Sequence, residues 1–173
     1  MYFLMERTLV ILKPDAVQRG LVGEIINRFE KAGLKIIGIK MLQPDEKHYH
    51  HHYETIGKIA SRRSQEIYER NTQFMMTGPV VAFVLEGVEA IDQVRKMAGD
   101  TEPKSANPGT IRGDYSHLSY DHVNNKSFKG LANLIHASAD AADAKQEIEH
   151  WFKPEDLFSY KLAHEHFTLQ PSE

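Results

Sequence analysis

The sequence contains no cysteine, and that absence excludes several kinds of site. A chain of 173 residues without a thiol has no disulfide, no zinc site built on thiolates and no cysteine nucleophile. The longest unbroken apolar run, Val80 to Leu85, is far shorter than the roughly 20 residues of a membrane-spanning helix. Residues 1–4 carry no charge and are too few for a signal peptide, so we expect no membrane partner.

The sequence also lacks a strong excess of charge and the common phosphate-binding motifs. There are 21 basic and 24 acidic residues, a formal net charge of −3, which gives no general attraction to nucleic acids. Neither the Walker A pattern nor the G-x-G-x-x-G pattern is present. A nucleotide site in this chain would therefore use neither a P-loop nor a Rossmann turn.

Hydrophobic periodicity predicts an α+β protein. The expected strands are 8–12, 34–41, 80–85 and 131–136. The expected helices are 21–32, a stretch that begins at Pro44, 57–75, 88–97 and 140–152. This order contains a ferredoxin-like βαββαβ core, a four-stranded antiparallel sheet covered by helices in a single domain. Residues 99–130 have little periodicity, and a loop of that length indicates function or disorder.

Two basic residues near turns are candidates for binding phosphate. Lys13 follows the first predicted strand and precedes Pro14, so its ammonium should emerge at a fixed place. The alternative for Lys13 is a solvated lysine. Arg112 lies in the turn-rich stretch 108–114, where glycines let the backbone approach a ligand and arginine can clamp phosphate. The alternative for Arg112 is a surface ion pair with an aspartate.

A histidine and a glutamate form a candidate nucleophile and its support. His136 ends the last predicted strand, and Glu147 lies on the final predicted helix, at the edge of its apolar face. A carboxylate that folds back to hold one imidazole nitrogen leaves the other free as a nucleophile. The alternatives are a histidine packed in or beside the core and an exposed helical glutamate.

Residues 48–52 contain four histidines. On a helix, His48 and His52 share a face at the i, i+4 spacing that suits a metal ion. No complete ligand set accompanies them, so we expect a solvated helix face rather than a metal site. Tyr53, the next residue, is expected to pack or to turn inward.

Four separated motifs resemble those of the nucleoside diphosphate kinase family, in the family's order. They are KPDAVQRGL at 13–21, GPVV at 78–81, PGTIRGD at 108–114 and NLIH at 133–136. The similarity runs from about residue 6 to about residue 157. It implies one family domain with a short extension at 1–4, an inserted loop at about 116–129 that resembles archaeal-like members, and an extension at about 158–173.

The resemblance implies reversible transfer of the γ-phosphoryl group from a nucleoside triphosphate to a nucleoside diphosphate, through a phosphohistidine and a ping-pong mechanism. By position, His136 matches the phosphorylated nucleophile and Glu147 the acid that holds its ring. Lys13 and Asn133 match residues that bind sugar hydroxyls, and Lys13 also reaches the phosphates. The phosphate-side matches are Tyr53, Arg95, Thr101 and Arg112, and Ser138 matches the serine that follows the histidine motif.

Two positions of the family pattern are altered here. Ala137 stands where glycine usually follows the active histidine, at the cost of one methyl group in that turn. The family's aromatic base clamp maps onto Ile67 or Tyr68, counted back from Gly78, and we expect Tyr68 to contact the base. The resemblance further implies Mg²⁺ carried mainly on the nucleotide's phosphates, a homo-oligomer (tetramer or hexamer) and a cytoplasmic location.

Three functions compete on this evidence. The first is the kinase, and the second is a nucleotide-binding regulatory module that kept the fold but lost turnover. The third is a nucleic-acid binder, which the sequence disfavours because it has no basic stripe with interleaved aromatics. The joint presence of His136, Lys13, Arg95, Arg112 and Glu147 favours the enzyme.

Overall fold

A four-stranded antiparallel sheet organises the chain, in the computed structural model that describes residues 5–124 and 130–168. The strands are β1 (Met5–Leu12), β2 (Lys35–Leu42), β3 (Val80–Val88) and β4 (Ile135–Ala137), and their order across the sheet is β2-β3-β1-β4. Each neighbouring pair is antiparallel. The predicted α+β class and ferredoxin-like arrangement are confirmed.

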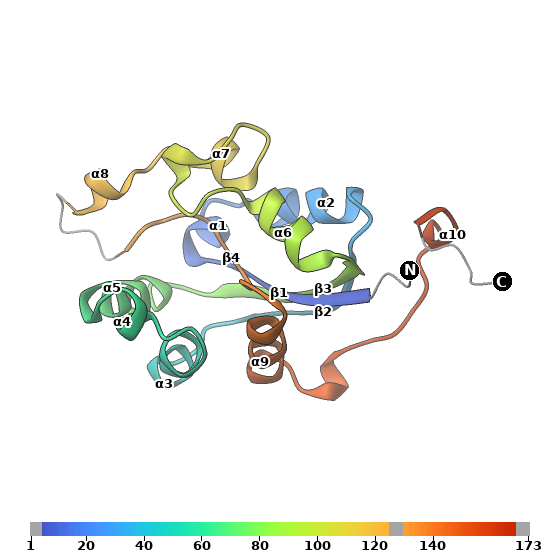
Figure 1. Cartoon of the computed structure of the whole chain (residues 1–173), viewed down its shortest axis with the longest axis horizontal. Coiled ribbons are helices and arrows are strands. Elements are labelled where there is room, and N and C mark those ends of the chain that lie inside the picture. The colour runs from blue at the N-terminus through green and yellow to red at the C-terminus, as the bar shows by residue number, and fades with distance from the viewer. Residues whose placement is uncertain (1–4, 125–129, 169–173) are drawn as a thin grey trace.

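Helices cover both faces of this sheet. They are α1 (Pro14–Gln18), α2 (Val22–Lys31), α3 (Glu46–His50), the π-helical η1 (His51–Ile56), α4 (Ile59–Arg62), α5 (Gln65–Met75), α6 (Ala90–Ala98), the 3₁₀ turn η2 (Pro103–Ser105), α7 (Ile111–Tyr115), α8 (Tyr120–Asn124), α9 (Ala141–Trp151), the 3₁₀ turn η3 (Pro154–Asp156) and α10 (Glu165–Thr168). Figure 1 shows α2, α6 and α7 on one side of the sheet and α3, α4, α5 and α9 on the other. No helix of the described residues is both long and apolar enough to cross a membrane.

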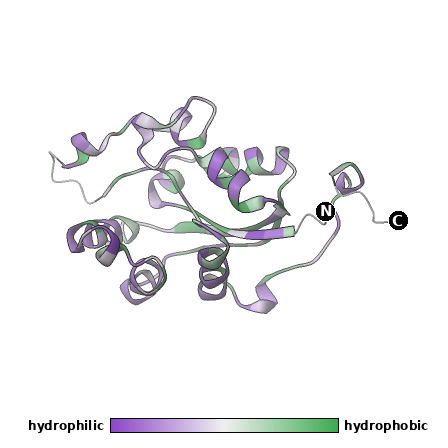
Figure 2. Cartoon of the chain, viewed as in Figure 1, coloured by the Kyte–Doolittle hydropathy of each residue, from purple (hydrophilic) through white to green (hydrophobic). Residues whose placement is uncertain are grey.

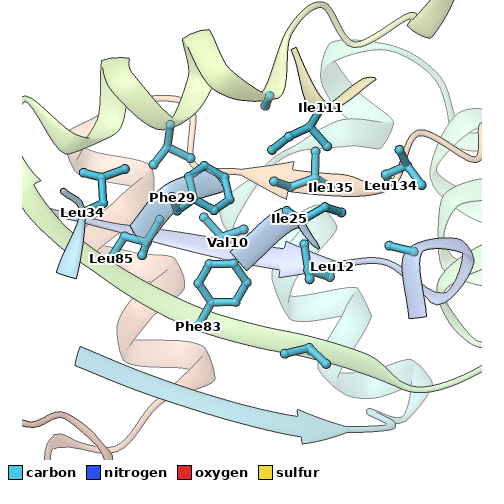
Figure 3. Close-up of a cluster of buried hydrophobic side chains, with 14 of the residues drawn as sticks. Val10, Leu12, Ile25, Phe29, Leu34, Phe83, Leu85, Ile111, Leu134 and Ile135 are labelled. Carbon is cyan, nitrogen blue, oxygen red and sulfur yellow. The ribbon is translucent and has the colours of Figure 1, made fainter. Parts of the chain in front are cut away.

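The unbroken apolar run in β1 follows from this two-sided cover. Successive strand residues point to opposite faces, so a strand buried on both faces must be apolar at every position. Val10 and Leu12 pack with α2 and α6 in the cluster of Figure 3. Leu9 and Ile11 pack on the other face with side chains of η1 and α9. Accordingly, Figure 2 shows apolar residues along the central strands and polar ones on the outer faces of the helices.

Three boundaries differ from the sequence-based expectations. Val88 ends β3, where it pairs with Met5, and the next helix begins only after Glu89, which has a left-handed φ of 50°. The stretch 99–130 contains η2, α7 and α8 rather than a bare loop. The last strand is shorter than predicted because Leu134 has a φ of +69°, a backbone conformation that a strand does not accommodate.

The expected extensions are only partly within the described residues. Residues 1–4, 125–129 and 169–173 lie outside them. The described part of the C-terminal extension follows the β2 edge, where Phe158 N–H donates to the Ile37 carbonyl at 2.7 Å. Farther along the extension, Glu165 forms an ion pair with Lys35 of β2 at 2.8 Å, and Lys35 also pairs with Glu86 of β3 at 3.2 Å. The extension therefore packs on the sheet edge far from β4.

Candidate active site

A cavity of about 330 Å³ lies where β4, the start of α1 and the end of α6 meet. Seven of the ten residues expected in the site line it: Lys13, Tyr53, Arg95, Thr101, Arg112, Asn133 and His136. They come from segments as far apart as residues 13 and 136, so the fold alone brings them together. Glu147, Ser138 and Tyr68 are not among the lining residues.

His136 and Glu147 form a direct pair at the base of this cavity. The His136 Nε2 atom lies 2.9 Å from Glu147 Oε1. Burial is the largest influence on Glu147 and raises its pKa. The positive charge and hydrogen bond of His136, with His52 and Ser138, outweigh burial and bring that pKa to about 2. The ionised carboxylate can only accept, so Nε2 carries a proton, and in the neutral imidazole Nδ1 therefore carries the lone pair.

The position of Glu147 follows from the periodicity of α9. Asp140 begins this helix by accepting hydrogen bonds from the N–H groups of Ala142 and Asp143. The buried residues of α9 are Ala144, Glu147, Ile148 and Trp151, at the i, i+3, i+4, i+7 spacing of one helix face. Glu147 therefore lies within the buried face, and the alternative of an exposed helical glutamate is wrong.

Ser138 lies behind His136 rather than on the cavity wall. Its hydroxyl donates to Glu147 Oε2 at 2.6 Å and accepts from the backbone N–H of Leu9 at 3.1 Å. The side chain is fully buried. Ser138 consequently orients the glutamate that holds His136, and we revise its expected role from nucleotide binding to positioning.

Lys13 and Asn133 are joined in a chain of hydrogen bonds across the cavity floor. Lys13 Nζ donates to Asn133 Oδ1 at 2.7 Å, and Asn133 Nδ2 donates to the Thr101 carbonyl at 2.8 Å. Burial, followed by the positive charge of Arg112, lowers the pKa of Lys13 to about 8, and Asp15 acts in the opposite direction. An anionic ligand bound beside the Lys13 amine would favour its protonated form.

Arg112 is almost completely buried and binds backbone rather than an aspartate. Its Nε, Nη1 and Nη2 atoms donate to the carbonyls of Asn133, Gly99 and Ile135, at 3.2, 2.7 and 2.6 Å. Burial is the main cause that lowers its pKa, to about 10. The neighbouring Asp114 pairs instead with Arg28 at 2.5 Å, so the expected Arg112–aspartate alternative is wrong.

A strained turn sets the direction in which β4 leaves the site. Leu134 has a φ of +69°, and the N–H of Ile135 bonds the Asn133 carbonyl at 2.8 Å across it, a γ-turn. Asp15 Oδ2 accepts from the Leu134 N–H at 3.0 Å, and the Leu134 carbonyl accepts from the Lys13 N–H at 2.8 Å. Strain of this kind costs about 1–3 kcal/mol and persists only where the surroundings hold it.

Another wall of the cavity is one face of α4 and α5. Ile67 and Asn71, four residues apart on α5, line it together with Arg63, which follows α4, and Ile67 is exposed. Tyr68, one residue on, turns about 100° away and its hydroxyl lies 2.9 Å from His50 Nδ1. This placement favours Ile67 over Tyr68 as the base-side residue.

The histidines of residues 48–52 are not uniformly solvated. His52 is buried, and its ring centroid lies 4.6 Å from that of His136. His48 is stacked on His150 with centroids 3.9 Å apart. The buried residues here are Tyr49, His52, Tyr53 and Ile56, so His52 shares a face with Tyr53 rather than with His48. Tyr53 lines the cavity from this face. Of the described residues, only His52, His136 and Glu147 group closely enough to hold a metal ion.

Comparisons with known proteins point to one family. The family model for nucleoside diphosphate kinase matches residues 6–157. The nucleoside diphosphate kinase of Borreliella burgdorferi is 48% identical over 158 residues, which is 91% of this chain and 93% of that protein. The Pyrococcus horikoshii enzyme is also 48% identical, over 94% of each chain.

Two solved structures of nucleoside diphosphate kinases are similar to this chain as well. A transition-state mimic from Borrelia burgdorferi, with bound vanadate and ADP, superposes with a TM-score of 0.92 at 46% identity and covers 96% of this chain and 98% of that one. A complex with CDP from Halobacterium salinarum gives 0.81 at 36% identity, covering 96% and 100%. Motifs, fold and relatives agree, and the chain belongs to the nucleoside diphosphate kinase family.

Proposed function

We propose that this chain performs the nucleoside diphosphate kinase reaction with His136 as the phosphorylated nucleophile. The observation that carries the assignment is the 2.9 Å contact between His136 Nε2 and the buried Glu147 carboxylate, beside an open cavity. That contact fixes the tautomer whose free Nδ1 can attack phosphorus. The family relationship supplies the reaction, and the geometry supplies the roles of the residues.

In the first half-reaction, the Nδ1 lone pair forms a bond to the γ-phosphorus of the nucleoside triphosphate. The bond from that phosphorus to the β-γ bridging oxygen breaks, and the diphosphate leaves with the electron pair. The imidazole becomes cationic as the N–P bond forms, and the Glu147 carboxylate at Nε2 stabilises that charge. In the second half-reaction, a terminal oxygen of another diphosphate forms a bond to the same phosphorus. The N–P bond breaks, and its electron pair returns to Nδ1, which restores neutral His136.

Cationic and polar side chains are placed to bind the phosphate groups. Lys13, Arg95 and Arg112 line the cavity and supply positive charge where charge develops on the transferred group. Thr101 and Tyr53 add polar groups to the same wall. Burial raises the pKa of the Tyr53 phenol, which therefore remains a neutral hydrogen-bond donor.

We propose Mg²⁺ as the cofactor, bound mainly through the nucleotide. Asp100 is the one carboxylate among the described residues that line the cavity, so the donor set fits an ion that takes most ligands from phosphates and water. When bound, the ion would neutralise phosphate charge. Asp100 is the residue that would contact it or its water.

The regulatory module without turnover is not favoured. A pocket that only binds nucleotide needs no buried carboxylate held ionised behind a histidine. Here Ser138, Glu147 and His136 form a continuous hydrogen-bonded chain that serves the nucleophile.

Labelling with ATP carrying a labelled γ-phosphate tests the assignment. We expect the purified protein to acquire an acid-labile, alkali-stable label, as a phosphohistidine would, and to lose it when a nucleoside diphosphate is added. Binding of nucleotide without a transferable label would instead support the regulatory module.

The alkaline limb of the pH profile should report Lys13. Its pKa of about 8 means that the free enzyme loses this positive charge as pH rises through about 8, so kcat/KM for the diphosphate should fall there. We would measure kcat/KM from pH 6.5 to 9.5 in wild type and in Lys13→Arg. The guanidinium stays charged throughout, so the variant should be slower but should lack this limb. An unchanged limb in Lys13→Arg would assign it to another group.

We also propose that the chain forms a homo-oligomer, tetramer or hexamer, in the cytoplasm. Ile39 and Met41 of the edge strand β2 are 51% and 61% exposed, an apolar surface that suits contact with a second copy. Light scattering should give the mass of four or six chains. A monomer would contradict the proposal, and cell fractionation checks the location.

A further inference from the structure

A second histidine, His52, lies beside the nucleophile and is not used by the mechanism above. We propose that His52 and Trp151 form a positioning pair, in which the indole N–H excludes a proton from His52 Nδ1 and so reserves the Glu147 carboxylate for His136. The inference deepens the proposed function and rests on His136 being the nucleophile.

His52 is placed where a proton on it would matter. The residue is 2% exposed and lies on η1, which packs against α9. Its ring stands edge-to-face with the His136 ring, at an interplanar angle of 77°. Its Nδ1 atom is 4.0 Å from Glu147 Oε1, the same oxygen that His136 Nε2 contacts at 2.9 Å.

Trp151 fixes the tautomer of this ring. The indole Nε1–H of Trp151 donates to His52 Nδ1 at 3.2 Å. An indole nitrogen can only donate, so Nδ1 must carry its lone pair and the single ring proton must sit on Nε2. If His52 were an imidazolium, its Nδ1–H would face the Trp151 Nε1–H, and neither group could accept a hydrogen bond from the other. Burial, followed by the positive charge of His136, also lowers the pKa of His52 well below its usual value.

The other titratable groups around the pair do not supply a competing charge. His48 packs edge-to-face on Trp151 with centroids 4.4 Å apart, and burial, then His150, lowers its pKa to about 4. Burial likewise lowers the pKa of His150, despite its bond to the His48 carbonyl. Lys40, Asp45 and His51 act on His48 and are not among the main influences on His52. Tyr53, at 4.8 Å from His52, stays neutral because burial raises its pKa.

The consequence of losing this arrangement follows from the charge balance. A protonated His52 would move its Nδ1–H toward Glu147 Oε1 and share the carboxylate with His136. Ser138 binds Oε2 at 2.6 Å, so a His52 N–H would have to share Oε1 with His136. The cation that forms on His136 during phosphorylation would then face a like charge at close range and a weakened counter-ion. A neutral His52 avoids both effects.

The test is the pH dependence of phosphoenzyme formation in Trp151→Phe, which removes the indole N–H and keeps an aromatic ring. At pH 8 the rate should stay within about threefold of wild type. Toward acid pH it should fall increasingly below wild type, because burial and the charge of His136 then oppose protonation of His52 without help from the indole donor. The double variant Trp151→Phe/His52→Leu cannot protonate there and should regain the wild-type shape of the profile, as should His52→Leu alone.

A purely structural role predicts a different pattern. If Trp151→Phe lowers the rate equally at pH 6 and pH 8, or if the double variant keeps the acid loss, the proposal is overturned. If wild type itself forms no phosphoenzyme, the proposed function fails, and that outcome is distinct.

Nitrogen NMR of wild type, labelled with ¹⁵N-histidine, gives a second readout that needs no variant at position 151. From pH 5.5 to 8, the His52 signals, assigned by their loss in His52→Leu, should show an unprotonated Nδ1 and a protonated Nε2. A protonated Nδ1, or an imidazolium at pH 6, contradicts the inference.

Discussion

The His136→Ala variant should take up no label from ATP carrying a labelled γ-phosphate, and its phosphoryl transfer should fall by at least about 10⁴-fold. Removing a nucleophile that works with a supporting group costs several orders of magnitude, because the remaining groups cannot replace the covalent step. The measurement is the initial rate of transfer between two nucleotides, together with the label retained on the chain after denaturation at alkaline pH.

Two controls separate this loss from unfolding. In His136→Ala, the buried Glu147 carboxylate loses its 2.9 Å partner. His136→Gln keeps an amide donor for that carboxylate, so the melting temperature of His136→Gln should be closer to that of wild type than the melting temperature of His136→Ala. His166→Ala removes an exposed imidazole that bonds to the local backbone carbonyl of Ala163, and its labelling should equal that of wild type. A label on the chain of His136→Ala would assign the nucleophile to another residue.

The sheet and its main helices were predictable because each has a simple apolar period. Residues 8–12 are apolar at nearly every position, and β1 is buried on both faces. The four-residue spacing of Leu21, Ile25 and Phe29 likewise identified α2, which buries Ile25 and Phe29. These patterns depend on local sequence alone, so they survive without knowledge of the tertiary contacts.

Side-chain direction at the site was harder to predict, because it depends on single-residue differences in backbone geometry. Tyr68 and Ile67 are adjacent, yet about 100° of helix rotation separates the cavity from His50. Leu134 resembles a strand residue, but its φ of +69° is imposed by contacts with Lys13 and Asp15, more than 100 positions away. No local pattern signals such a turn.

The contacts of the buried polar side chains Arg112 and His52 were also not predictable from the sequence. The sequence allows an ion pair between Arg112 and an aspartate, but Arg112 binds three carbonyls from two separate segments. His52 was expected on a solvated face and lies against His136. Both outcomes depend on long-range packing, whereas the inward direction of Glu147 was already present in the spacing of Ala144, Ile148 and Trp151.

Arg112→Ala should reduce kcat/KM by at least about 10³-fold, equivalent to about 4 kcal/mol of transition-state stabilisation. Two losses add together. The cavity loses a cation near the transferred phosphoryl group, and the carbonyls of Gly99, Asn133 and Ile135 lose the guanidinium that joins them. Since Ile135 precedes His136 and Asn133 binds Lys13, release of these carbonyls also displaces the nucleophile and the lysine. A displacement of about 1 Å can cost about 10²-fold by itself.

Arg112→Lys separates charge from geometry. An ammonium restores the positive charge but cannot donate in three fixed directions at once, so we expect it to recover only part of the activity. The matched control is Arg28→Ala, which breaks the ion pair with Asp114 on the same helix, α7, but does not line the cavity. A partly exposed pair of this kind contributes about 0.2–1 kcal/mol to stability, so Arg28→Ala should change kcat/KM by no more than a few fold. Should Arg112→Lys match wild type, positive charge alone would account for Arg112, and the three carbonyl bonds would have no part in catalysis.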